Sequence, residues 1–168
     1  MSRHDSDEAA LNERDAGYLR RAIALADQGR QRGNRPFGAV IVGADDRVLA
    51  EAWCNTTETG DCTGHAETSA IRLASPQCSR EELAQATLYS SAEPCVMCAG
   101  AIFWANLGRV VFGIDAVALR DFRGERLDQR DAELSCRDVF DASPSRIECI
   151  GPALREEARQ SHLGAWKD

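Results

Sequence analysis

The sequence of 168 residues predicts an α/β fold, in which helices cover a β-sheet. The main observation is the order of its hydrophobic patterns: a helix comes first, then a pair of strands, and then helix and strand alternate. Such an order implies crossover connections, which place the helices against the sheet. The hydrophobic content of 43% and charged content of 28% are typical of a globular protein, so we expect one domain spanning residues 1–168.

The first part of the chain predicts a helix followed by a β-hairpin. Apolar residues recur at helical spacing over residues 9–31. A continuous apolar run at 36–42 predicts a buried strand, and a polar turn leads to a return strand at 48–53. Residues 1–8 are polar and lack the apolar core of a secretory signal, so we expect a disordered leader there.

The rest of the chain predicts alternating helices and strands after a polar loop at residues 55–63. We expect these elements at residues 65–74, 87–90, 95–105, 109–113, 146–150 and 153–162. Residues 115–143 are charged and have no clean period, so we expect loop and short helix over the mouth of a site.

Residues with metal-binding chemistry stand at the starts of two of these helices. His65 begins one helix, and Cys95 and Cys98 lie on the first turn of the other. An imidazole and two thiolates suit Zn²⁺, and three protein ligands leave the fourth tetrahedral position open for water. Helix N-termini also lower the pKa of thiols. We therefore predict one zinc ion per chain, bound by His65, Cys95 and Cys98.

Glu67 follows His65 by two residues and lies beside the predicted metal without being needed as a ligand. A carboxylate in that place can carry protons while the metal acidifies water, so we predict that Glu67 is catalytic. The alternatives are a redox C-x-x-C pair and a structural zinc site. A redox pair would not need His65 and Glu67, and a structural site would want a fourth Cys or His.

Composition restricts the partners and the compartment. The net charge is −7 with a pI near 5.0, and no basic run appears, which argues against a nucleic-acid substrate. No segment is long and apolar enough to span a membrane. Seven cysteines, an odd number, without an export signal indicate reduced thiols and a cytoplasmic protein.

At these residues the chain resembles the cytidine deaminase-like superfamily, in the branch of guanine deaminases, cytosine deaminases and tRNA adenosine deaminases. The resemblance runs from about residue 18 to residue 113 and rests on residues 36–42, His65-Ala66-Glu67 and residues 91–104. The pair H-x-E and P-C-x-x-C is the signature of zinc deaminases. The resemblance implies a three-layer α/β/α sandwich with a five-stranded mixed sheet, and a homodimer.

The resemblance also implies roles around a bound base. The backbone amides of Ala66 and Cys95 are expected near the reacting oxygen. Phe37 and Trp104 are expected to line the substrate pocket as a flat apolar slot. No basic group for a phosphate is evident, so we expect nucleotides to be poor substrates.

Two departures from the family pattern concern the substrate. The family usually has an asparagine where this chain has Cys54, so either Asn55 takes over its contact or the contact is lost. Guanine deaminases carry a downstream acidic residue, for which Asp115 and Asp128 are the candidates here. Gly64 also replaces the usual alanine.

We therefore expect hydrolytic deamination of a free nucleobase or nucleoside, with release of ammonia. A guanine-like purine is the first choice, and cytosine or an aminotriazine or azapyrimidine follows closely. One alternative is a tRNA-specific adenosine deaminase, which shares the four site residues. A non-catalytic zinc-stabilised binding domain is another, but it would have no need of Glu67.

Overall fold

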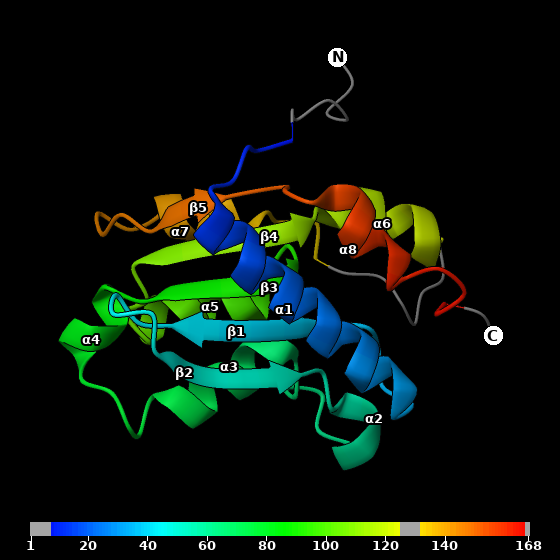
Figure 1. Cartoon of the computed structure of the whole chain (residues 1–168), viewed down its shortest axis with the longest axis horizontal. Coiled ribbons are helices and arrows are strands. Elements are labelled where there is room, and N and C mark those ends of the chain that lie inside the picture. Colours follow the sequence, from blue (N-terminus) through cyan, green and yellow to red (C-terminus); the bar gives the residue numbers. More distant parts are fainter. Residues whose placement is uncertain (1–7, 125–131, 167–168) are drawn as a thin grey trace.

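A five-stranded mixed sheet forms the centre of the computed structural model, which describes residues 8–124 and 132–166 (Figure 1). The strand order is β2-β1-β3-β4-β5. β1 (Gly38–Val42) pairs antiparallel with β2 (Val48–Trp53) and with β3 (Thr87–Ala92). β4 (Arg109–Ile114) and β5 (Glu148–Ile150) continue the sheet in parallel. The predicted five-stranded mixed sheet is confirmed.

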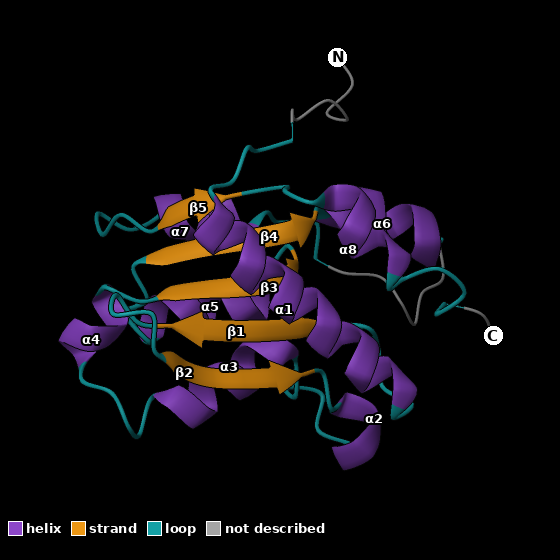
Figure 2. Cartoon of the chain, in the orientation of Figure 1, coloured by secondary structure: helices purple, strands orange, loops and turns teal. Residues whose placement is uncertain are grey.

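Helices cover both faces of this sheet, which confirms the predicted three-layer sandwich (Figure 2). One face carries α1 (Glu13–Gln31) and α8 (Arg155–Gln160), and the other carries α3 (Ala66–Ala74), α5 (Val96–Trp104) and α7 (Cys136–Asp141). The remaining helices are α2 (Thr56–Thr59), α4 (Arg80–Ala84) and α6 (Ala116–Arg123). None of the helices described is long and apolar enough to cross a membrane.

β1 shows why the chain needs both layers of helices. All five of its residues are buried. Ala39 and Ile41 belong to the core beneath α3 and α5, and Val40 and Val42 belong to the core beneath α1. Successive side chains of a strand point to opposite faces, so a continuous apolar strand requires cover on both sides.

Side-chain caps set several helix boundaries that periodicity alone misplaces. The first helix begins at Glu13 rather than at residue 9, because the Asn12 side chain accepts a hydrogen bond from the Asp15 amide. α7 is a short helix in the stretch where loop and short helix were expected, and it begins with a capping box between Ser135 and Asp138. α2 has no side-chain cap and no buried residue, so the hydrophobic pattern gives no sign of it.

A buried ion pair connects α1 to the sheet. Asp15 accepts hydrogen bonds from both Nη atoms of Arg109, at 2.8 and 2.6 Å, and from the Tyr89 hydroxyl at 2.6 Å. The Arg109 hydrogen bonds lower the pKa of Asp15 below its ordinary value. Removing one partner of such a pair would leave a buried charge unpaired, which is strongly destabilising.

The described N-terminal residues dock against the start of α8. The Glu8 carboxylate accepts a hydrogen bond from the Arg155 amide, and the Ala9 amide donates to the Pro152 carbonyl. Residue 8, the last residue of the expected leader, thus has a contact with α8. Residues 1–7 lie outside the described part of the chain.

Candidate metal centre and active site

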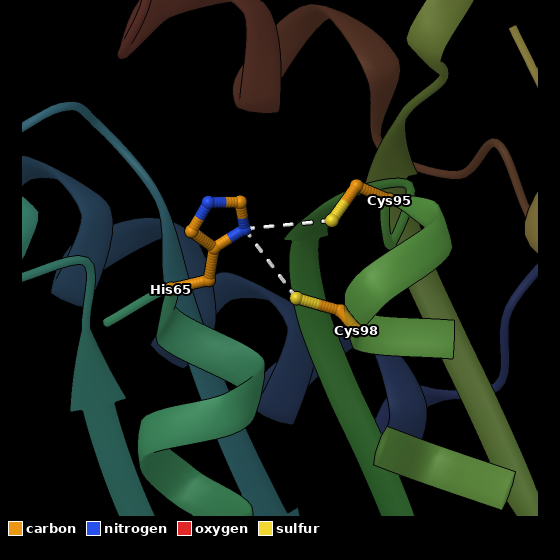
Figure 3. A group of neighbouring side chains, drawn as sticks. All are labelled: His65, Cys95 and Cys98. Atoms are coloured by element: carbon orange, nitrogen blue, oxygen red, sulfur yellow. Dashed lines mark hydrogen bonds between the residues drawn. The ribbon is translucent and has the colours of Figure 1, made fainter. Parts of the chain in front are cut away.

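Two helix N-termini bring the three predicted metal ligands together (Figure 3). His65 is the N-cap residue of α3, and Cys95 is the N-cap residue of α5. The Nδ1 atom of His65 lies 3.5 Å from the Sγ atoms of both Cys95 and Cys98. All three ligand atoms lie within 4.8 Å of one another.

The separations fit zinc. A Zn–S bond of ~2.3 Å and a Zn–N bond of ~2.0–2.1 Å at the tetrahedral angle place sulfur and nitrogen about 3.6 Å apart, close to the 3.5 Å observed. No fourth Cys, His, Asp or Glu joins the cluster within the described residues, as expected for a catalytic rather than a structural site. Cys62 lines the neighbouring pocket but is not part of the cluster.

The two thiols of the cluster differ in how readily they become anionic ligands. The pKa of Cys95 is lowered to about 4, first because the Cys98 thiol donates a hydrogen bond to its sulfur and then through its contact with His65. The same hydrogen bond, together with burial, raises the pKa of Cys98. Cys95 therefore presents a thiolate, the form that binds metal.

Glu67 lies next to the cluster and is almost inaccessible, with 4% of its surface exposed. Its Oε1 accepts a hydrogen bond of 2.9 Å from the Ser90 hydroxyl of β3, and its Oε2 lies 3.5 Å from the Cys98 sulfur. Burial raises the pKa of this carboxyl. A buried carboxylate that one hydroxyl holds against the metal ligands is placed to exchange protons there.

A cavity of about 540 Å³ opens onto His65 and Glu67. This volume lies in the range of pockets for small organic ligands, ~300–1,000 Å³. Its apolar wall includes Phe37, Leu119 and Trp166. The pocket therefore joins the metal ligands to side chains from the turn before β1, from α6 and from the C-terminal segment.

Trp104 does not line this pocket of its own chain, contrary to the expectation from the resemblance. It is the last residue of α5 and 79% exposed, and its ring contacts Phe103 edge-on. Cys95 and Cys98 at the other end of the helix lie at the metal site. Trp166 instead supplies the aromatic wall, with Phe37 packed edge-on against it at 6.0 Å between ring centroids.

Asn55 likewise lies outside the pocket wall, whereas Cys54 and Thr56 are part of it. A Cβ atom at Gly64 would lie 2.1 Å from Asn55 Oδ1, so the Asn55 side chain packs against this glycine. The backbone N–H of Asn55 also donates a hydrogen bond to the backbone carbonyl of Gly64. At the position of the family asparagine, the buried Cys54 thiol therefore lies in the pocket wall, and the Asn55 side chain does not.

The remaining predicted residues divide between the site and the periphery. Ala66 opens α3 and Cys95 precedes α5, so both amides lie at helix N-termini, where the helix itself leaves amides unpaired. Asp115 caps α6 and pairs with Arg155 at 3.3 Å, outside the pocket wall. Asp128 lies outside the described residues.

Several wall residues were not predicted, among them Glu93, Arg35 and Arg123. Glu93 precedes Pro94-Cys95 in the motif, which was a usable signal. Its oxygens accept hydrogen bonds from the Ala116 amide and the Ser135 hydroxyl, so it holds α6 and α7 beside the metal centre. The two arginines also overturn the expectation that the pocket has no basic group.

Comparisons with known proteins place this geometry in a family. Residues 12–114 match the model of the cytidine and deoxycytidylate deaminase zinc-binding region. The chain is 40% identical over 161 residues to a probable cytosine deaminase of Schizosaccharomyces pombe, covering 93% of this chain and 94% of that protein. It is 43% identical over 99 residues to guanine deaminase of Bacillus subtilis, covering 58% and 63%.

A solved structure from a study of A-to-I editing by tRNA:A34 deaminases has a similar fold. Its TM-score is 0.68 at 30% identity, over 87% of this chain and 99% of that one. The family model spans more than half of the chain, and its zinc-binding region contains the observed His65, Cys95 and Cys98 cluster. The chain therefore belongs to the zinc-dependent cytidine and deoxycytidylate deaminase family.

Proposed function

We propose that this enzyme hydrolytically deaminates an amino-substituted nucleobase or nucleoside and releases ammonia. The observation that carries the proposal is Glu67, buried against the His65–Cys95–Cys98 cluster at the base of a ligand-sized cavity. A zinc-stabilised binding domain would have no use for an acid in that position, because burying a carboxylate is costly.

Among the described wall residues, two carboxylates are available for proton transfer. Glu93 has both oxygens engaged, by the Ala116 amide and the Ser135 hydroxyl. Glu67 has one oxygen held by Ser90 and the other directed toward the metal ligands. This difference supports Glu67 as the acid–base residue and Glu93 as a structural one.

Hydrolysis of the C–N bond requires a proton to move from water to the substrate. When bound, Zn²⁺ supplies the Lewis acidity that brings the pKa of water near 7. Glu67 accepts the water proton and delivers it to the ring nitrogen beside the carbon that carries the amine. It then transfers the second proton to the departing nitrogen, which leaves as ammonia while a carbonyl forms. Burial raises the pKa of Glu67, which helps it to hold each proton between transfers.

The pocket gives less support to guanine than to a smaller base. Trp104, which would extend a flat slot for a two-ring base, lies outside the pocket of its own chain. The relative that matches nearly the whole chain is named a probable cytosine deaminase. We therefore place a single-ring base of the cytosine type first, and guanine and aminotriazines or azapyrimidines after it.

Trp166→Ala is expected to weaken kcat/KM for the base by about 1–3 kcal/mol, the scale of one base–aromatic stack. Trp166 lines the pocket, and its Nε1–H donates to His162 Nδ1 at 3.2 Å, which fixes the ring. Trp166→Phe keeps a ring and should retain most of the activity. Steady-state kinetics of both variants check this, and equal losses in the two would remove stacking as the explanation.

Ammonia release measured with cytosine, guanine, adenosine and a tRNA anticodon stem-loop tests the substrate class. We expect turnover of a free base and none of the stem-loop, since the net charge of −7 opposes phosphate-backbone binding. Turnover of the stem-loop alone would make the chain a tRNA adenosine deaminase, while the zinc chemistry would stand.

We also propose a homodimer that buries the outer face of α5. This helix contains no charged residue, and its last residue, Trp104, is exposed away from the pocket wall. Apolar surface gathered on one helix is typical of a protein interface. Light scattering should give twice the chain mass for the native protein and the monomer mass for Trp104→Glu. A native monomer would contradict the proposal.

The seven cysteines support a reducing compartment. All seven are free in the structure, including the buried Cys54 and Cys136. We therefore propose the cytoplasm as the location of this enzyme.

A further inference from the structure

The wall of the active-site pocket carries two arginines whose presence the deamination chemistry does not explain. Arg35 comes from the turn between α1 and β1, and Arg123 is the last residue of α6. Both stack on the indole of Trp166, with guanidinium carbons 5.0 and 5.6 Å from the ring centroid. Two cationic heads are thus gathered around one aromatic side chain of the pocket. We call Arg35, Arg123 and Trp166 the arginine rim.

The Arg35 guanidinium forms no ion pair with a carboxylate among the described residues. Arg32 provides the contrast: it also stacks on a tryptophan, Trp53 at 5.5 Å, but its guanidinium pairs with Glu58 at 2.6 Å. Arg35 has no such carboxylate partner within residues 8–124 and 132–166. An arginine that lies on an aromatic face in the wall of a pocket is suited to receive an anion.

The acidic groups of the pocket are held away from Arg35 by other partners. Glu67 is held by Ser90 beside the metal ligands, and Glu93 is held by Ala116 and Ser135. The pocket therefore has a metal-and-acid part, where the amine must react, and a cationic part beside Trp166. The rim offers local positive charge on a protein whose net charge is −7.

The cavity is also larger than a base alone requires. A purine has about eleven non-hydrogen atoms. If each atom is given ~30 Å³, the volume that one molecule has in liquid water, the purine fills at most ~330 Å³. The cavity has about 540 Å³. With the amine-bearing carbon at the metal ligands, space remains for a substituent that reaches the rim.

We propose that the arginine rim binds an anionic substituent of the substrate, a carboxylate or a phosphate that the amino-substituted ring carries directly or through a sugar. This inference rests on the proposed deaminase function and adds the charge of the substrate to it. The guanidinium fork matches both anions through paired N–H donors, and stacking on Trp166 holds the fork in place.

Matched pairs of substrates test the rim. Ammonia release is measured with cytosine against cytosine-5-carboxylate and with cytidine against cytidine 5′-monophosphate. We expect kcat/KM for at least one acidic member to exceed that of its neutral partner about tenfold or more in the native enzyme, the gain of a charge-assisted bidentate contact. Arg35→Gln should remove about tenfold for that acidic member and change the neutral one by less than about twofold.

Arg32→Gln is the matched control, because it removes an arginine that stacks on a tryptophan outside the pocket wall. It should leave both members of each pair unchanged. A gain confined to the carboxylate or to the monophosphate identifies which anion the rim serves. A native preference for the neutral members, or a loss in Arg35→Gln that is equal for both members, overturns the inference while leaving deamination intact.

Binding separates a failure of the rim from a failure of the reaction. Calorimetry on the zinc-loaded native protein and on Arg35→Gln uses cytidine and cytidine 5′-monophosphate, and cytosine and its 5-carboxylate, whether or not they turn over. Tighter binding of an acidic ligand that Arg35→Gln weakens about tenfold supports the rim even if no ammonia forms. Equal binding of acidic and neutral ligands overturns it.

Discussion

Glu67→Gln is expected to lower kcat by about three orders of magnitude or more, while the fold and the zinc content stay as in the native enzyme. Glutamine has the same shape and can still accept the hydrogen bond that the Ser90 hydroxyl donates to Glu67 Oε1. It cannot accept a proton from water or deliver one to the ring nitrogen. Both transfers of the proposed mechanism therefore fail together.

Single-turnover and steady-state ammonia release, with zinc analysis of the same sample, measure this effect. Glu93→Gln is the control, because Glu93 is the other pocket carboxylate but has both oxygens tied to Ala116 and Ser135. We expect it to affect stability more than kcat, with a loss of less than about tenfold. If Glu67→Gln kept a tenth of the native activity, the proton transfer would belong to another group.

The metal centre could be predicted from sequence because its geometry is local. His65 and Cys95 are N-cap residues, so each ligand is placed by the helix that begins there. Only one long-range fact was needed, that α3 and α5 begin at the same edge of the sheet. The alternation of helices and strands already implies that fact.

The outer part of the pocket could not be predicted in the same way. Trp166, Arg35 and Arg123 are far apart in sequence, and no spacing links them. They meet because Phe37 and Phe122 of α6 both pack against the His162 ring, which also accepts a hydrogen bond from Trp166. The resemblance alone favours Trp104 over Trp166 as the aromatic wall of the pocket. Trp104, however, is at the end of α5 opposite to Cys95 and the metal site.

The placement of Asn55, just after β2, has a steric explanation that involves both Asn55 and Gly64. Asn55 occupies the space that a side chain at residue 64 would need, since a Cβ there would approach its Oδ1 to 2.1 Å. The asparagine at 55, placed as it is, therefore requires a glycine at 64. The sequence alone does not show that Asn55 lies outside the pocket wall, because this packing depends on both positions.

Cys98→Ala is expected to abolish activity and to reduce zinc from about one ion per chain to less than about a tenth. Cys98 is fully buried, and its sulfur lies 3.5 Å from both His65 Nδ1 and Glu67 Oε2. Its removal leaves two ligands, one on each helix. The apparent unfolding temperature should fall as well, because a metal that binds only the folded state stabilises it by mass action.

Cys136→Ala is the matched control for this prediction, since Cys136 is equally buried but lies outside the metal cluster. It loses the same volume of sulfur from the core and should keep one zinc per chain. Elemental analysis and thermal unfolding with and without a chelator separate the two effects. The chelator should destabilise the native protein and Cys136→Ala, and it should leave Cys98→Ala unchanged. Native zinc content in Cys98→Ala would show that the ion is bound elsewhere, and Glu67 would then lose the metal beside which its proton transfer operates.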